Sequence, residues 1–94
     1  MNNSRRKDLR KARAFLDRVD RLLDIIDQAK DIVSDVESDE SDALDNYPEN
    51  LQNSERYQDS EESIDDLNDA IDRIDGLQGD ISDITTILED VINR

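Results

Sequence analysis

Apolar residues recur along the first half of the chain at alternating spacings of three and four, the repeat of an α-helix. The main row holds Leu9, Ala12, Leu16, Val19, Leu23, Ile26 and Val33. A second row beside it holds Phe15, Leu22, Ala29 and Val36, and it is widened by Ile25 and Ile32. This stripe is wider than the two positions in seven of a two-stranded coiled coil, and it is typical of a helix that contacts several neighbours. We therefore expect a first helix over about 5–41.

The second half repeats the pattern in three heptad rows. These rows hold Leu67, Ile74, Ile81 and Leu88; Ala70, Leu77, Ile84 and Val91; and Ile64, Ile71, Gln78, Thr85 and Ile92. They predict a second helix over about 55–92, each helix being roughly 50 Å long at ~1.5 Å per residue. We expect an all-α fold in which residues 1–94 form a single domain, a hairpin of two long antiparallel amphipathic helices. Because both stripes are too wide for one partner helix, we also expect two hairpins to dimerise into a four-helix bundle.

The connection over 45–54 predicts a short helical corner. Asn46 or Tyr47 can cap a turn that begins with Pro48, whose missing N–H group is harmless at a first helical position. Asn53 can end this turn in the left-handed conformation, and Ser54 can then cap the second helix. The residues expected to close this end of the hairpin are Leu44, Leu51 and Tyr57.

Two stretches leave alternatives open. Residues 34–42 read "SDVESDESD", which is either a disordered acidic linker or, because it lacks Gly and Pro, a continuation of the first helix. Gly76 and Gly79 stand inside the second helix, where each costs ~1 kcal/mol relative to Ala. We favour a bend or a close helix crossing there over a contact surface for a partner.

The corner also carries a resemblance. The segment "YPENLQNSERYQ" and the acidic heptads "SIDDLNDAIDRIDGL" after it resemble a family of small helical proteins common in bacterial phages and integrative elements. The match covers roughly residues 42–75. It implies a helical hairpin from a mobile element, and it carries over no active-site residues. Because Met1 to Arg21 lacks the apolar region of a signal peptide, we expect the chain to act in the cytoplasm of a bacterial host cell.

Composition narrows the chemistry. The chain has no Cys and no His, so it lacks thiol chemistry and the commonest general base and metal ligand. An EF-hand keyed on Gly76 would need oxygen ligands at 71 and 73, where the chain has Ile71 and Arg73. We expect no enzyme, no cofactor and no metal site. No apolar run approaches the ~18 residues of a membrane span.

Charge is the unusual quantity, because 12 basic residues face 26 acidic ones, a net charge of −14. Residues 1–21 hold eight bases and three acids, a net of +5, whereas residues 22–94 carry −19. The basic stretch Arg5 to Arg13 could contact nucleic acid, but the acidic remainder would repel it. Such a chain is expected to attract a basic protein and to avoid nucleic acid and membrane.

Carboxylates on the second helix fall opposite its apolar rows, at about one per 4 Å of helix, close to the ~3.4 Å per charge of a DNA strand. We expect the partner-binding residues to be Glu61, Glu62, Asp65, Asp69, Asp72, Asp75, Asp80 and Asp83. The first hypothesis is a DNA mimic that inhibits a basic nucleic-acid-binding protein, such as a CRISPR or restriction nuclease of the host. The alternative is a structural or interaction bundle without mimicry, in which acidic faces only keep the protein soluble.

Overall fold

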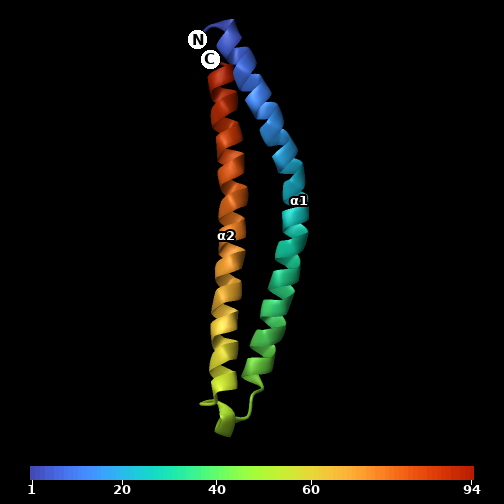
Figure 1. Ribbon diagram of the computed structural model, residues 1–94, viewed down its shortest axis with the longest axis vertical. Helices are drawn as coiled ribbons and strands as arrows, with labels where there is room; N and C mark the ends of the chain where they lie inside the picture. Colours follow the sequence, from blue (N-terminus) through green and yellow to red (C-terminus); the bar gives the residue numbers. More distant parts are fainter. The chain divides into compact units, whose positions relative to one another are not determined.

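A computed structural model describes residues 1–94, which form two long helices and no strand. Helix α1 spans Asn3–Asp45, the short 3-10 helix η1 spans Glu49–Leu51, and helix α2 spans Glu55–Ile92 (Figure 1). The two long helices pack against each other as an antiparallel hairpin, which confirms the predicted fold class. Dimerisation remains a prediction.

Helix α1 is longer than expected, with 43 residues in place of the predicted 5–41. It begins two residues earlier because the side chain of Asn2 caps it, its Oδ1 accepting the backbone N–H of Arg5 at 2.8 Å. It continues without interruption through residues 34–42, which confirms the helical interpretation of that stretch over a linker. No Gly or Pro interrupts this segment, and the Ser41 hydroxyl donates to the Glu37 carboxylate at 2.9 Å.

The corner confirms one predicted cap and corrects two others. Ser54 caps α2, because its Oγ accepts the backbone N–H of Tyr57 at 3.2 Å. The turn η1 is preceded by Pro48 and receives no side-chain cap, so the capping predicted for Asn46 or Tyr47 was wrong. The Asn46 amide instead donates to the carbonyl oxygen of Asp42 at 2.9 Å, a carbonyl in the last turn of α1. The left-handed conformation predicted for Asn53 was also wrong, since no residue has a positive φ.

The corner is closed by Tyr57, as predicted, together with Tyr47, which was not expected in this role. Tyr47 and Tyr57 pack edge to face, with ring centroids 5.5 Å apart and an interplanar angle of 61°. Leu44 is half-buried as predicted, but Leu51 is 44% exposed and does not close the hairpin.

The chain divides into two compact units. Unit 1 comprises Met1–Asp27 and Asp75–Arg94, the first part of α1 beside the last part of α2. Unit 2 comprises Gln28–Ile74, which includes the corner and the helical segments on either side of it. We describe each unit by itself.

Neither unit has a deep core, because a pair of helices can cover only one strip of each helix. Ile92 in unit 1 is the only buried residue, at 5% exposure. The half-buried apolar seam of unit 1 holds Leu9, Leu16, Leu23, Ile26, Ile81, Leu88 and Val91. In unit 2 the α2 side of the seam is apolar except for Ser60, but five of the seven half-buried residues on the α1 side are polar. The half-buried polar residues there are Lys30, Ser34, Glu37, Glu40 and Ser41.

The two helical glycines do not mark a crossing point within the chain. A Cβ atom added to Gly76 or Gly79 would meet no atom within 4 Å. The close helix crossing predicted there was therefore wrong, and both positions have open space around them.

Candidate protein-binding surfaces

The predicted acidic residues are all exposed, but the structure divides them between the two units. Unit 2 contains Glu61, Glu62, Asp65, Asp69 and Asp72. Unit 1 contains Asp75, Asp80 and Asp83. These eight residues belong to one helix, yet the charges around them differ strongly between its two parts.

Charge is segregated by unit. Unit 1 holds nine basic and ten acidic residues, a net charge of −1. Unit 2, also of 47 residues, holds three basic and 16 acidic residues, a net charge of −13. Almost the whole excess of negative charge therefore belongs to the unit that contains the corner.

Carboxylates in unit 2 come from both helices. The part of α1 in this unit supplies seven acids, and the part of α2 supplies eight. These parts have 18 and 20 residues, so fifteen carboxylates stand along ~30 Å of helix, about one per 2 Å. Duplex DNA carries one charge per ~1.7 Å. The ion pair within α2, Arg73 Nε to Asp69 Oδ2 at 3.1 Å, is highly exposed and offsets little of this charge.

A shallow open depression of about 260 Å³ lies between the two helices of unit 2. It is lined by Ser41, Leu44, Asp45, Glu61, Ile64 and Asp65. Two apolar side chains form part of this lining and three carboxylates surround them. That combination suits the aliphatic stem and cationic head of a lysine or arginine from a partner.

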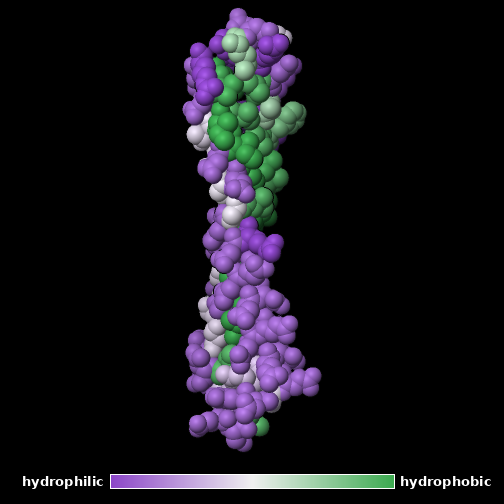
Figure 2. Space-filling view, turned by 90° about the vertical axis from the view of Figure 1, so that its left-hand side faces the viewer, coloured by the Kyte–Doolittle hydropathy of each residue, from purple (hydrophilic) through white to green (hydrophobic).

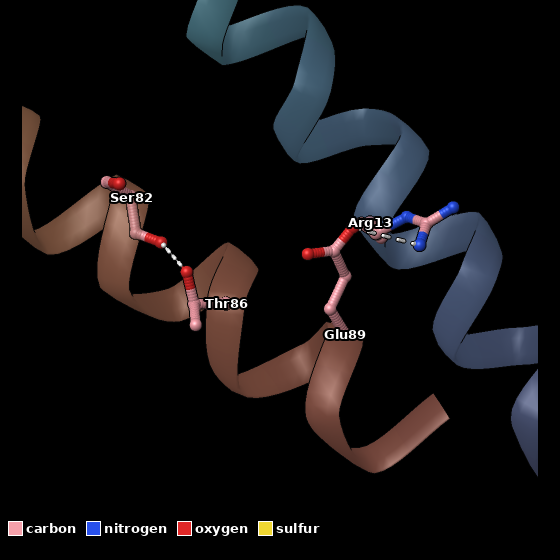
Figure 3. Close-up of polar contacts among 4 residues, drawn as sticks. All are labelled: Arg13, Ser82, Thr86 and Glu89. Carbon is pink, nitrogen blue, oxygen red and sulfur yellow. Dashed lines mark hydrogen bonds and ion pairs between the residues drawn. The ribbon is translucent and has the colours of Figure 1, made fainter. Parts of the chain in front are cut away.

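One edge of unit 1 is closed by polar contacts between the helices. Arg13 Nη1 lies 3.5 Å from Glu89 Oε1 (Figure 3), so the basic start of the chain is paired with the acidic end of α2. Further along the same edge, the Gln78 amide donates to Asp27 Oδ1 at 2.8 Å. The Thr86 hydroxyl on α2 donates locally, to the carbonyl oxygen of Ser82 at 3.1 Å.

The opposite edge of unit 1 is apolar and open. We call it the apolar face, and it comprises Phe15, Leu22, Ile25, Leu77, Ile84 and Ile87, each between 46% and 63% exposed. On α1, Phe15 and Leu22 are rotated by nearly half a turn from Arg13 and Asp27, which lie on the closed edge. Figure 2 shows apolar atoms gathered on one face of the unit that contains the two chain ends.

The sequence predicted this surface only in part. The width of the two apolar stripes indicated that each helix needs more than one neighbour. Which residues the intrachain seam would leave uncovered depends on how the two helices are rotated against each other, and hydrophobic spacing does not determine that rotation. Eight of the eleven exposed large apolar residues belong to unit 1, so the uncovered surface is concentrated where the charge is nearly balanced.

The structure brings together no set of three or more His, Cys, Asp or Glu side chains that could hold a metal ion. No helix is both long enough and apolar enough to cross a membrane. The two candidate binding surfaces are the carboxylates of unit 2 and the apolar face of unit 1, and both are of a kind that binds macromolecules.

Comparison with family models, with curated proteins and with solved structures finds no match to this chain. The resemblance of its corner to proteins of phages and integrative elements therefore stays a prediction.

Proposed function

We propose that this chain is a non-catalytic protein that binds and inhibits a basic nucleic-acid-binding protein through the carboxylates of unit 2. One observation carries the proposal: both helices of unit 2 contribute to a charge density of about one carboxylate per 2 Å, close to the ~1.7 Å of duplex DNA. A groove that binds DNA presents Lys and Arg at phosphate spacing. Unit 2 offers acceptors of the same charge at a similar linear density, held on a helical scaffold.

The residues proposed to contact the target are Glu61, Glu62, Asp65, Asp69 and Asp72, which all belong to unit 2. The other three predicted residues, Asp75, Asp80 and Asp83, belong to a unit whose nine bases compensate the charge locally. They contribute less to attraction over a distance. The target class that the mobile-element resemblance suggests is a CRISPR or restriction nuclease in the cytoplasm of a bacterial host, and the acting form is a homodimer.

The experiment compares two variants of equal charge. One carries Asp65→Asn, Asp69→Asn and Asp72→Asn in unit 2, and its matched control carries Asp75→Asn, Asp80→Asn and Asp83→Asn in unit 1. Each protein is immobilised on a resin and incubated with bacterial lysate at low salt. The bound proteins are then eluted with a salt gradient or, in a parallel experiment, displaced with duplex DNA. The captured proteins are identified by mass spectrometry.

We expect the native chain to capture a nucleic-acid enzyme that duplex DNA displaces. The unit 2 variant should bind it at least ~10-fold more weakly, since three lost charge contacts are worth ~0.5–1 kcal/mol each. The unit 1 control should elute close to the native protein. Equal loss in both variants, or capture indifferent to salt and DNA, would contradict the proposal.

A second function is favoured by a different observation, the apolar face of unit 1. A structural or interaction bundle without nucleic-acid mimicry would use that face for assembly, and unit 2 would serve only to keep the assembly soluble. In this case both sets of Asp→Asn changes would leave partner binding unaltered.

A further inference from the structure

Unit 1 has two unequal edges. The closed edge is completed by the Arg13–Glu89 ion pair and the Gln78–Asp27 hydrogen bond, so its polar groups have partners within the chain. The apolar face on the other edge has no such covering. Phe15 is 63% exposed even though the Arg18 guanidinium lies 5.3 Å from its ring centroid. Contiguous exposed apolar residues from two helices mark an interaction surface more often than chance exposure.

We infer that a second copy of this chain covers the apolar face of unit 1, with the two chains running in opposite directions across the contact. The inference rests on the homodimer part of the proposed function and is independent of the basic target. It assigns the face, the orientation and the residues to that dimer.

The surface area fits one such contact. The chain exposes 7127 Å², whereas a compact monomer of its 10.8 kDa mass exposes ~5,500 Å². A standard interface removes about 800 Å² from each partner. One contact on the apolar face would therefore bring the exposed surface of each chain about halfway to that of a compact protein.

Net charge favours unit 1 over unit 2 as the part of the chain that contacts a second copy. Two copies of unit 2 would bring together two net charges of −13, which repel each other strongly at the short distances of an interface. Two copies of unit 1 would bring together net charges of only −1. The apolar surface and the balanced charge thus coincide on the same unit.

Charge also selects the orientation. Within unit 1, residues 5–13 of α1 hold six bases and one acid, a net of +5, whereas residues 17–27 hold four acids and two bases, a net of −2. When the two copies run in opposite directions, the basic stretch of one lies beside the acidic stretch of the other. The chain leaves unit 1 through residues 27 and 75, at the end away from the termini. Reversal therefore places these exits at opposite ends of the contact.

This arrangement has a functional consequence. A dimer joined through unit 1 leaves both copies of unit 2 uncovered, so a single particle presents two carboxylate surfaces. A target with two basic grooves, or two targets, would be bound with a gain in avidity that a monomer lacks.

The first test is sedimentation equilibrium of the native chain and of two matched variants in the micromolar range. The interface variant carries Leu22→Gln and Ile84→Gln, at residues 54% and 46% exposed in unit 1. The control carries Leu51→Gln and Ile32→Gln, one leucine and one isoleucine that are 44% and 65% exposed in unit 2. We expect twice the 10.8 kDa chain mass for the native chain and the control, and a dimer dissociation constant raised at least ~100-fold in the interface variant.

The second test reads orientation without depending on a destabilising change. The chain has no native cysteine, so Val19→Cys, beside the apolar face and near its centre, can be joined to its copy by a short bifunctional maleimide. Ser82→Cys on the closed side of α2 is the control. Rapid joining of Val19→Cys, with little joining of Ser82→Cys, is expected if α1 of one copy lies on α1 of the other near this residue. Ala12→Cys, two turns away on the same row of α1, reads the orientation: chains that run in opposite directions separate it from its copy by ~20 Å, so it should join slowly, whereas a parallel contact would join it as rapidly as Val19→Cys.

Three results would overturn the inference. They are a native chain that stays monomeric, a dimer that the control weakens more than the interface variant does, or joining through Ser82→Cys in place of Val19→Cys. None of them bears on the lysate capture by unit 2, which depends steeply on salt. The dimer should depend on salt only weakly, so failure of one proposal is distinguishable from failure of the other.

Discussion

Unit 1 and unit 2 are built from the same two helices and have 47 residues each, yet their surfaces are nearly opposite in character. Unit 1 has balanced charge, an apolar seam and an apolar face. Unit 2 has a net charge of −13 and a seam in which Lys30 and Glu37 continue the heptad row that Leu9, Leu16 and Leu23 occupy in unit 1. The comparison indicates that apolar surface is concentrated in one part of the hairpin and net charge in the other.

This separation has a physical reason. Like charges at the density of unit 2 repel each other and destabilise the compact state, and they would also oppose self-association. The apolar face thus lies in unit 1, where the repulsion between like charges is smallest. The acidic surface then remains exposed in the monomer and in the proposed dimer.

The largest effect expected from a single substitution is at Ile92 in unit 1. Ile92→Ala removes the one buried side chain and should lower the free energy of unfolding by ~2–3 kcal/mol. Ile32→Ala makes the same chemical change at a residue of unit 2 that is 65% exposed, and it should change stability by less than ~0.5 kcal/mol. Urea denaturation followed by circular dichroism measures both. Equal losses would mean that the two units do not differ in packing.

The glycines of α2 in unit 1 should show a gain. Gly76→Ala and Gly79→Ala each add a Cβ that meets nothing within 4 Å, and each should stabilise the helix by ~0.5–1 kcal/mol. Thermal unfolding of the single and double variants measures this. Sedimentation equilibrium of the same variants measures the dissociation constant of the proposed dimer. If either alanine raises that constant, the glycine that it replaces lies in a contact between two copies.

The same glycines show where the sequence was insufficient. Helix existence, type and approximate length followed from hydrophobic spacing, and the cap at Ser54 followed from its place before an acidic first turn. A glycine inside a helix is found both where another segment packs closely against the helix and where no segment does, and only the structure distinguishes the two cases. The prediction for the corner was wrong for a related reason. The Asn46 side chain could either cap the turn that follows it or bind the end of α1, and it donates to the carbonyl oxygen of Asp42, four residues back.

The candidate site was also only partly predictable. All eight acidic residues were expected on the surface, and they are exposed. Their division into a compensated group and an uncompensated group depends on residues of α1 that lie more than fifty positions away in the chain, such as Arg13, which is 76 positions from its partner Glu89. Charge counted along α2 alone therefore overstated the acidity near Asp80 and Asp83.

A smaller effect is expected from the charges at the helix ends in unit 2. Helix α1 has no base in its last turn and ends in acids, which oppose the helix dipole, whereas Glu55 in the first turn of α2 complements it. Asp42→Asn with Asp45→Asn should stabilise the protein by ~0.3–1 kcal/mol per residue, and Glu55→Gln should destabilise it by a similar amount. Thermal unfolding at low and high salt checks both signs, since both effects should shrink as salt is raised. The same sign for the two ends would exclude the dipole as the cause.

The smallest effect is expected on the closed edge of unit 1. Arg13 and Glu89 have side chains that are 32% and 54% exposed, and their charged atoms lie 3.5 Å apart, so water screens most of their attraction. A double-mutant cycle with Arg13→Gln and Glu89→Gln should give a coupling energy of ~0.2–1 kcal/mol, falling further at high salt. The Gln78–Asp27 pair, lost in Gln78→Ala, gives a neutral comparison on the same edge. A coupling energy well above this range would mean that the Arg13–Glu89 ion pair contributes strongly to the stability of unit 1. Unit 1 would then differ from unit 2 in its paired charges more than in its apolar packing.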